Sequence, residues 1–305
     1  MKTIIETNNI IKSYEKITAL ENINLTVYDD EIFGLIGPDG AGKTSLIRIL
    51  TTLILPDSGS ANVLGFDIIK DFKIIRNEIG YMPGRFSLYQ DLTVEENLKL
   101  FATIFGTTIE ENYDLVKPIY SQIEPFKNRR AGQLSGGMKQ KLALSCALIH
   151  KPKLLILDEP TTGVDPVSRK EFWDMLKDLK KAGITILVST PYMDEASLCD
   201  RVALIQEGKI LSVSTPDDII SKFPRKLYSI TANNMHKLII ALRDFEHSNT
   251  VFTFGETVHY TDKRVTKLNI DELINYLQNV ELTNIKITEI SAGIEDCFME
   301  LMRKQ

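Results

Sequence analysis

One glycine-rich segment has the residue types that bind the phosphates of a nucleotide. It fits the pattern G-x-x-x-x-G-K-[ST], with a strand-like apolar run before it and a helix-like run, Ser45–Leu50, after it. Glycines let backbone N–H groups turn toward an anion, and the start of a helix adds partial positive charge. The residues expected to bind nucleotide here are Gly37, Pro38, Asp39, Gly40, Ala41, Gly42, Lys43, Thr44 and Ser45.

Three side chains of this segment have different expected roles. Lys43 places a point charge on the β- and γ-phosphates, and the Thr44 hydroxyl binds Mg²⁺. Asp39 is unusual in an anion-binding loop, since a carboxylate is tolerable there only if it points away from the phosphates. The alternative interpretation, a chance glycine-rich turn, is disfavoured by the flanking strand and helix.

A second chemical element is an apolar run, Leu154–Leu157, that ends in two carboxylates. At the end of a strand, Asp158 is placed to hold Mg²⁺ through water, and Glu159 to polarise the attacking water as general base. An acidic strand end without a catalytic role is the alternative. The phosphate site supplied by Lys43 makes that alternative the weaker one, so the sequence predicts an ATPase that binds Mg-ATP.

The elements around these residues predict an α/β fold of the P-loop NTPase class. The segment from Ile5 to Ile36 reads as an antiparallel β subdomain that leads into a central strand. The insert at about 90–150 reads as mainly helical, with Thr93 and Glu96 as a capping box. The runs Lys153–Leu157 and Ile184–Ser189 lack alternation, which is typical of parallel strands covered on both faces.

After about Pro216 the pattern changes to shorter units in the order β-α-β-α-β, which predicts a small α+β module of ferredoxin-like type. We therefore expect an ATP-binding domain over residues 1–218 and an accessory module over residues 219–305. The units are Leu227–Thr231, Met235–Phe245, Val251–His259, Ile270–Val280 and Ile285–Ile290.

Composition excludes several classes of protein. Of 305 residues, 43% are hydrophobic, but no apolar stretch approaches the roughly 18 residues of a membrane-spanning helix. The chain carries a net charge of −5 and has no basic run, so we expect no nucleic-acid partner. The three cysteines and four histidines lack metal-ligand spacing, which argues against a catalytic zinc. No signal peptide is evident, and we expect a soluble cytoplasmic protein.

A third motif, Leu134–Gln140 with the letters LSGGMKQ, lies before the strand that ends in the carboxylates. With the three motifs in this order, the chain resembles the nucleotide-binding subunits of ABC transporters over roughly Ile5–Thr215. The remainder, including the last helix at Ile294–Leu301, resembles the extension of bacterial type-2 exporters of the multidrug-efflux-like group.

This resemblance implies partners as well as chemistry. Two subunits of the family sandwich two ATP molecules, and Ser135, Gly136 and Gly137 would touch the nucleotide on the opposite P-loop. Tyr14 matches the aromatic residue that stacks on adenine, with a buried strand tyrosine as the alternative. A separate permease would dock near Phe86–Leu98, which places the protein on the inner face of the cell membrane. The transported substrate is not encoded in this chain.

Two departures from the family pattern shape the functional hypothesis. Gly84 stands where the family has a glutamine that senses Mg²⁺, and Pro191 where it has a histidine that contacts the γ-phosphate. Neither residue offers a side-chain donor or acceptor. With the LSGG motif intact, this favours a heterodimer with a second ATPase subunit, while a homodimer stays open. The alternatives are a nucleotide-gated binding module without hydrolysis, and a soluble ATPase of the family that acts on ribosomes or DNA.

Overall fold

The computed structural model describes residues 1–264 and 269–303, which divide into two compact units. The first unit is Met1–Asp218 and the second begins at Ile219. Helix α7 (Pro216–Ser221) spans the division. Each unit has a separate cluster of buried apolar side chains, so each has its own core.

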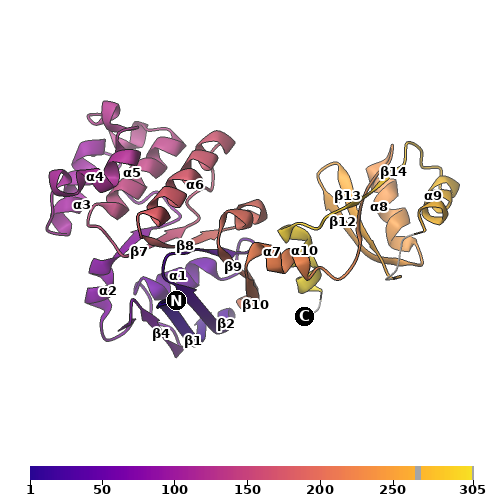
Figure 1. Ribbon diagram of the computed structural model, residues 1–305, viewed down its shortest axis with the longest axis horizontal. Coiled ribbons are helices and arrows are strands. Elements are labelled where there is room, and N and C mark those ends of the chain that lie inside the picture. Colours follow the sequence, from indigo (N-terminus) through magenta and orange to yellow (C-terminus); the bar gives the residue numbers. More distant parts are fainter. Residues whose placement is uncertain (265–268, 304–305) are drawn as a thin grey trace. The chain divides into compact units, whose positions relative to one another are not determined.

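The first unit is built on a six-stranded sheet in the order β10-β9-β3-β8-β7-β6, of which Figure 1 labels β7, β8, β9 and β10. Neighbouring strands from β9 to β6 run parallel, and β10 is an antiparallel edge strand. Every residue of β3, β7 and β8 is buried, which explains their continuous apolar sequences. The strands are β3 (Ile32–Ile36), β6 (Ile79–Met82), β7 (Leu154–Asp158), β8 (Thr185–Thr190), β9 (Arg201–Gln206) and β10 (Lys209–Ser214).

A second, antiparallel sheet has the order β2-β1-β4-β5. Its apolar side chains join those of β3 and α1 (Lys43–Leu50) in one core. The predicted antiparallel subdomain and the α/β fold of the P-loop class are thereby confirmed. The strands are β1 (Thr3–Tyr14), β2 (Ile17–Tyr28), β4 (Ser58–Val63) and β5 (Phe66–Asp67).

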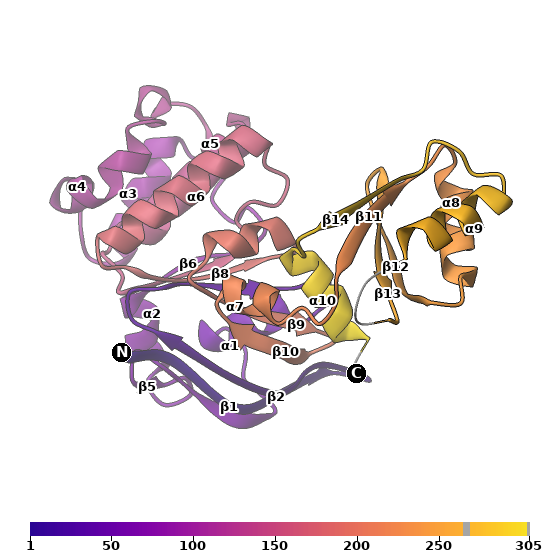
Figure 2. The ribbon, with the colours of Figure 1, turned by 45° about the vertical axis from the view of Figure 1, so that its right-hand side comes forward.

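Helices make up most of the segment between β6 and β7, as predicted. The capping box is present, because Thr93 Oγ1 accepts from Glu96 N at 3.2 Å and Thr93 N donates to Glu96 Oε2 at 2.8 Å. Helices α5 and α6 lie side by side (Figure 2). The helices of the first unit are α1, α2 (Phe72–Glu78), α3 (Val94–Ile104), α4 (Ile109–Tyr120), α5 (Gly136–Leu148) and α6 (Pro166–Lys181), with short 3₁₀ turns η1 (Glu124–Phe126), η2 (Ala131–Gln133) and η3 (Met193–Leu198).

The second unit has a four-stranded antiparallel sheet in the order β12-β13-β11-β14. The predicted single strand over Val251–His259 is wrong, since a turn at Gly255, with φ of 55°, splits this stretch into a hairpin. The element order is therefore β-α-β-β-α-β, that of a split βαβ unit. The elements are β11 (Leu227–Thr231), α8 (Met235–Asp244), β12 (Ser248–Phe254), β13 (Thr257–Asp262), α9 (Ile270–Asn279), β14 (Lys286–Ile290) and α10 (Ile294–Met302).

Within residues 1–264 and 269–303, no helix combines the length and the apolar composition needed to cross a membrane.

Candidate functional site

The glycine-rich segment forms the turn between β3 and α1. Gly40 and Gly42 have φ angles of 78° and 105°, which L side chains rarely adopt. A Cβ on Gly42 would lie 2.5 Å from the carbonyl oxygen of Ala19, so the close approach of two backbones also requires glycine. The turn brings the start of α1 to the carboxyl end of the parallel sheet, where ligands of such sheets bind.

The first turn of α1 fits an anion. Its N-cap, Gly42, has no side chain to bond the free N–H groups, and no acidic residue lies in the first turn. The Lys43 side chain is 3% exposed, and the partners of its ammonium group are oxygen atoms. It donates to the carbonyls of Gly37 at 2.7 Å and Pro38 at 3.0 Å, and lies 3.0 Å from Glu159 Oε1. A phosphate would offer the same kind of partner.

Two oxygen ligands suited to Mg²⁺ meet beside this loop. Thr44 Oγ1 donates to Asp158 Oδ1 at 3.3 Å, which joins α1 to the end of β7. Ser189 Oγ, at the end of β8, donates to the same oxygen at 2.7 Å and holds the carboxylate in place. A hydroxyl and a carboxylate next to a phosphate site match the ligands that Mg²⁺ takes in nucleotide sites.

Glu159 is held in a conformation that few non-glycine residues adopt. Its φ is 50°, and its N–H donates to the carbonyl and hydroxyl oxygens of Ser189 at 3.1 Å and 3.0 Å. The Ser189 bonds stabilise this backbone, so the side chain projects toward Lys43. Sequence reasoning missed Ser189, because only its position at the end of β8 distinguishes it from other polar residues.

Two further candidates of the nucleotide site are exposed. Tyr14 is 43% exposed at the end of β1, and its hydroxyl accepts from Ser45 Oγ at 3.4 Å. The alternative of a buried strand tyrosine is therefore wrong, and stacking on adenine stays a prediction. Asp39 is exposed at the outer side of the loop, as an acidic residue in an anion-binding turn must be.

The LSGG motif begins α5, with Ser135 as the N-cap that accepts a hydrogen bond from Met138 N at 3.4 Å. A Cβ on Gly137 would lie 2.7 Å from Ser168 Oγ, and one on Gly136 would lie 3.7 Å from Gly163 O. Among described atoms within 4 Å of these added carbons, none belongs to the P-loop. The motif thus faces the start of α6 rather than the nucleotide site of its own chain.

Comparison with known proteins shows the family. The family described as "ABC transporter" matches residues 20–162. Nod factor export ATP-binding protein I of Rhizobium sp. (strain N33) is 35% identical over 308 residues, covering 100% of this chain and 98% of that protein. The chain belongs to the ABC transporter family. It is similar to the ATP-binding proteins of these transporters.

The probable multidrug ABC transporter ATP-binding protein YbhF of Escherichia coli (strain K12) is 43% identical over 289 residues, or 93% of this chain. The chain spans about half the length of that ABC protein, 49%. Among solved structures, an ATP binding subunit of an ABC transporter has a TM-score of 0.66 and 29% identity, over 72% of this chain and 93% of that one. A dimeric ATP-binding cassette in a post-hydrolysis state, bound to ADP and Pi, has a TM-score of 0.64 and 26% identity, over 70% and 98%.

Both departures from the ABC pattern lie next to the proposed site. A Cβ on Gly84 would lie 3.0 Å from Asp158 O and 3.8 Å from the carboxyl carbon of Asp158. Pro191 directly follows Thr190, whose carbonyl accepts from Gly37 N at 3.3 Å. A side chain at position 84 would therefore reach Asp158, the candidate Mg²⁺ ligand, and position 191 adjoins the start of the P-loop.

A buried carboxylate that the sequence did not single out joins the segments around the candidate site. Glu195 is 2% exposed, and its Oε2 accepts from Thr190 Oγ1 at 2.5 Å and from Thr161 Oγ1 at 3.1 Å. Its Oε1 lies 3.8 Å from Arg169 Nε. Glu195 thus ties the segment after β8 to the segment after β7 and to α6. In sequence it is one of two adjacent acids, and nothing there shows which is buried.

We expect Glu195→Ala to lower the free energy of unfolding of the first unit by about 3 kcal/mol, because two buried hydroxyls lose their acceptor and the Arg169 guanidinium loses a carboxylate 3.8 Å away. Urea unfolding followed by the fluorescence of Trp173, the single tryptophan and 2% exposed on α6, measures this change. Asp194→Ala is the matched control, since Asp194 is 70% exposed and its loss should change the value by less than about 0.5 kcal/mol. Equal effects of the two substitutions would contradict the linking role of Glu195.

Proposed function

We propose that this chain binds Mg-ATP at its P-loop and couples ATP binding and hydrolysis to export by a separate membrane permease. The main support for this proposal is that four side chains converge at the carboxyl ends of β3 and β7: Lys43, Thr44, Asp158 and Glu159. Export is supported by the names of relatives that act in Nod factor export or are probable multidrug transporters. The chain spans about half the length of YbhF, so what is known of that whole protein does not transfer directly. The substrate class and the partners are therefore part of this proposal.

In the proposed reaction the γ-phosphoryl group of ATP passes to water. Lys43 and the free N–H groups of α1 bind the phosphates, and Thr44 with Asp158 would hold Mg²⁺. When bound, Mg²⁺ neutralises charge on the β- and γ-phosphate oxygens. Glu159 accepts the proton of the attacking water. The Lys43–Glu159 ion pair, 3.0 Å long, must open for this step, so phosphate replaces Glu159 as a partner of Lys43 and frees the base.

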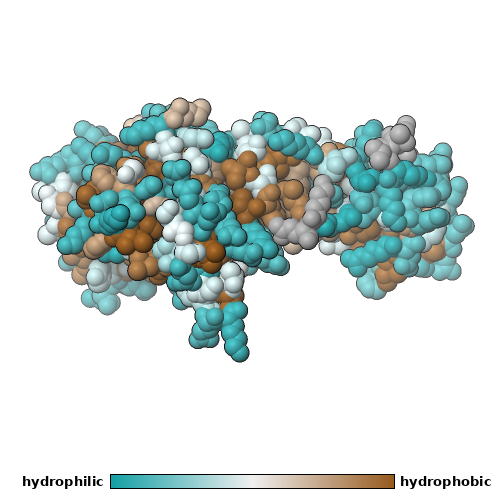
Figure 3. Space-filling view, turned by 90° about the horizontal axis from the view of Figure 1, so that it is seen from below, coloured by the Kyte–Doolittle hydropathy of each residue, from teal (hydrophilic) through white to brown (hydrophobic). Residues whose placement is uncertain are grey.

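The permease would dock in a groove beside the sheet. A groove of about 280 Å³ lies between the core and the helical insert, and apolar side chains such as Leu53, Phe101 and Phe105 line it. A smaller adjoining cavity is lined by Phe86 and Leu88, within the docking segment predicted from sequence. Figure 3 shows apolar patches among the hydrophilic surface of the first unit on one face. Concave apolar surface of this kind suits an inserted helix or loop.

The dimer is part of the proposal too. The LSGG motif forms the N-terminus of α5, where the N-cap Ser135 is exposed and the added carbons on its two glycines do not meet the P-loop of the same chain. A second subunit would bring its nucleotide to this motif. Because Gly84 and Pro191 offer no polar side chain to the chain's own site, we propose that this site hydrolyses ATP slowly. The partner of a heterodimer would then carry the faster site, completed by Ser135 and Gly137 of this chain.

Mg-ATP turnover of the purified chain tests this function directly, with Lys43→Ala as background and ATP binding measured in the same preparation. We expect tight binding with slow turnover that disappears in Lys43→Ala. Fast turnover of the chain alone would remove the case for a second ATPase subunit. Absence of ATP binding would contradict the whole proposal.

One observation favours a second candidate function, a nucleotide-gated binding module that never hydrolyses. Gly84 and Pro191 both remove groups expected to act on the γ-phosphate or Mg²⁺. Glu159 opposes this candidate, since a module without hydrolysis has no need of a base in a strained conformation. ATP-dependent dimerisation without turnover, also in the presence of a permease, would select the module.

A further inference from the structure

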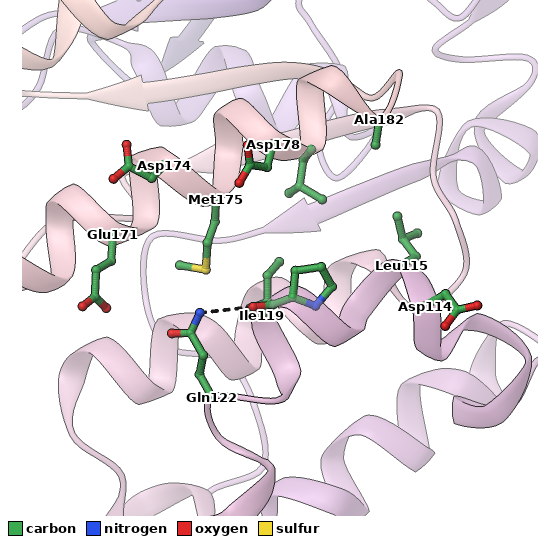
Figure 4. Close-up of a pocket in the computed structure, with 11 residues that line it drawn as sticks. Asp114, Leu115, Ile119, Gln122, Glu171, Asp174, Met175, Asp178 and Ala182 are labelled. Atoms are coloured by element: carbon green, nitrogen blue, oxygen red, sulfur yellow. Dashed lines mark hydrogen bonds between the residues drawn. The ribbon is translucent and has the colours of Figure 1, made fainter.

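A groove of the first unit lies away from the nucleotide site, between α4 and α6 (Figure 4). Its volume is about 490 Å³. It contains none of the residues proposed to bind nucleotide or to carry the LSGG motif. The lining residues are Asp114, Leu115, Pro118, Ile119, Gln122, Glu171, Asp174, Met175, Asp178, Leu179 and Ala182.

Two parallel stripes of side chains make this groove. Along α6 the lining positions begin at Glu171 and recur every three or four residues to Ala182, the residue after the helix. A similar stripe runs along α4 from Asp114 to Ile119 and ends at Gln122, two residues beyond that helix. At about 1.5 Å per residue, the stripe on α6 is roughly 16 Å long. The groove is therefore elongated, with the length of about three helical turns.

The floor of the groove is apolar and its rim is acidic. Ile119, Met175 and Leu179 are buried beneath it, while the four carboxylates in the lining are all exposed. The lining includes no lysine or arginine among the described residues. Only two of the carboxylates have ion pairs of 4 Å or less with described residues, Glu171 with Lys141 and Asp178 with Lys181, both at 2.8 Å.

The polar groups offered by this groove are mainly acceptors. Pro118 lies inside α4 and has no N–H, so it cannot bond the carbonyl of Asp114 one turn earlier. Gln122, the one amide in the lining, donates its Nε2 to the carbonyl of Pro118 at 3.1 Å. A complementary occupant would bring donors and positive charge along the rim, and apolar groups to the floor.

We propose that the groove between α4 and α6 binds a basic amphipathic helix of a partner protein. An apolar stripe at positions i, i+3, i+4 and i+7 of that helix covers Ile119, Met175 and Leu179, and flanking lysines or arginines pair with Asp114 and Asp174. The elongated shape favours a helix over a compact organic cation. A compact ligand would use the apolar floor, but only part of the carboxylates along the two stripes.

The probe for this proposal is a synthetic helical peptide of about 15 residues, with leucine on one face and lysine on the other. Its binding to the full chain is measured by fluorescence anisotropy at about 0.15 M salt, where distant charges are screened. A peptide with glutamate in place of lysine tests charge, and tetrabutylammonium tests the compact cation. A peptide that carries one cysteine tests where the peptide binds, through a disulfide cross-link to the Gln122→Cys variant. The three native cysteines are buried and should not compete for this cross-link.

Two charge-matched variants separate the groove from general attraction to an acidic protein. The groove variant is Asp114→Lys with Asp174→Lys, and the control is Glu6→Lys with Glu256→Lys, both at exposed positions outside the groove. Each substitution adds two charges, so both variants have the same net charge. We expect the groove variant to weaken binding about ten-fold, the control less than about two-fold, and cross-linking at position 122.

Three results would overturn the proposal: no binding of the lysine peptide, equal losses in the two variants, or equal binding of the glutamate peptide. If tetrabutylammonium displaced the labelled peptide at a lower concentration than the unlabelled lysine peptide does, the groove would be assigned to a small cation instead. Unchanged circular dichroism of both variants verifies that they fold. Since the assay contains no nucleotide, its outcome is independent of the proposed ATPase function.

Discussion

Lys43→Ala is expected to weaken ATP binding by about 30-fold or more. The Lys43 side chain is 3% exposed, and its ammonium group is held by two loop carbonyls and by Glu159, so a phosphate would meet a desolvated and fixed charge. Loss of one partner from such a charge-assisted contact costs about 2–5 kcal/mol, which is a factor of about 30 to several thousand in affinity. Isothermal titration calorimetry with Mg-ATP on the full chain measures the change.

Lys70→Ala is the matched control, because Lys70 is exposed and lies outside the P-loop. It removes the same side chain and the same charge, and its affinity for ATP should stay within about two-fold of the original protein. The fluorescence of buried Trp173 verifies folding of both variants. If Lys43→Ala bound ATP as tightly as Lys70→Ala, the P-loop would not be the nucleotide site.

The parts of the fold that follow from short stretches of sequence were predictable. The capping box at Thr93 involves residues three apart, and its chemistry is complete within one turn. The continuous apolar runs of β7 and β8 mark strands buried on both faces, so the α/β fold could be predicted as well. The roles proposed for Lys43 and Glu159 were inferred from the order of the motifs in the sequence. In the structure, Lys43 Nζ lies 3.0 Å from Glu159 Oε1.

Other features depend on contacts between distant segments, which no local pattern encodes. The hairpin was missed because strand-like residues flank a turn of only two residues, Gly255 and Glu256. Ser189 donates a hydrogen bond to Asp158 at the end of β7 only because β7 and β8 pair in parallel register, with Asp158 opposite Ser189. Likewise, Asp114 and Asp174 share one groove only because α4 and α6 form its two walls.

The second large effect concerns the two departures from the family pattern. We expect Pro191→His combined with Gly84→Gln to raise Mg-ATP turnover of the chain by about 100-fold. One preorganised donor to the developing charge contributes about 10²–10³ in rate, and histidine at position 191 would restore such a donor beside the P-loop. Glutamine at position 84 would restore an amide beside Asp158, where an added Cβ lies 3.8 Å from the carboxyl carbon.

The control for this gain is Pro191→Ala with Gly84→Ala. A Cβ at position 84 lies 3.0 Å from Asp158 O, so both variants carry the same close contact there. Both also release position 191 from the fixed φ of proline. Only the His and Gln variant supplies donors and acceptors, and the difference between the two rates therefore measures side-chain chemistry rather than backbone freedom.

Glu159→Gln, added to the His and Gln variant, then identifies the base. General-base catalysis contributes about 10²–10⁴-fold, so we expect the restored turnover to fall by at least about 100-fold while ATP still binds. Glutamine keeps the shape and the contact to Lys43 but cannot accept the proton of water. Equal turnover of the alanine and the His and Gln variants would show that neither departure limits hydrolysis. The slow step would then lie in dimerisation, and the argument for a heterodimer from Gly84 and Pro191 would fall.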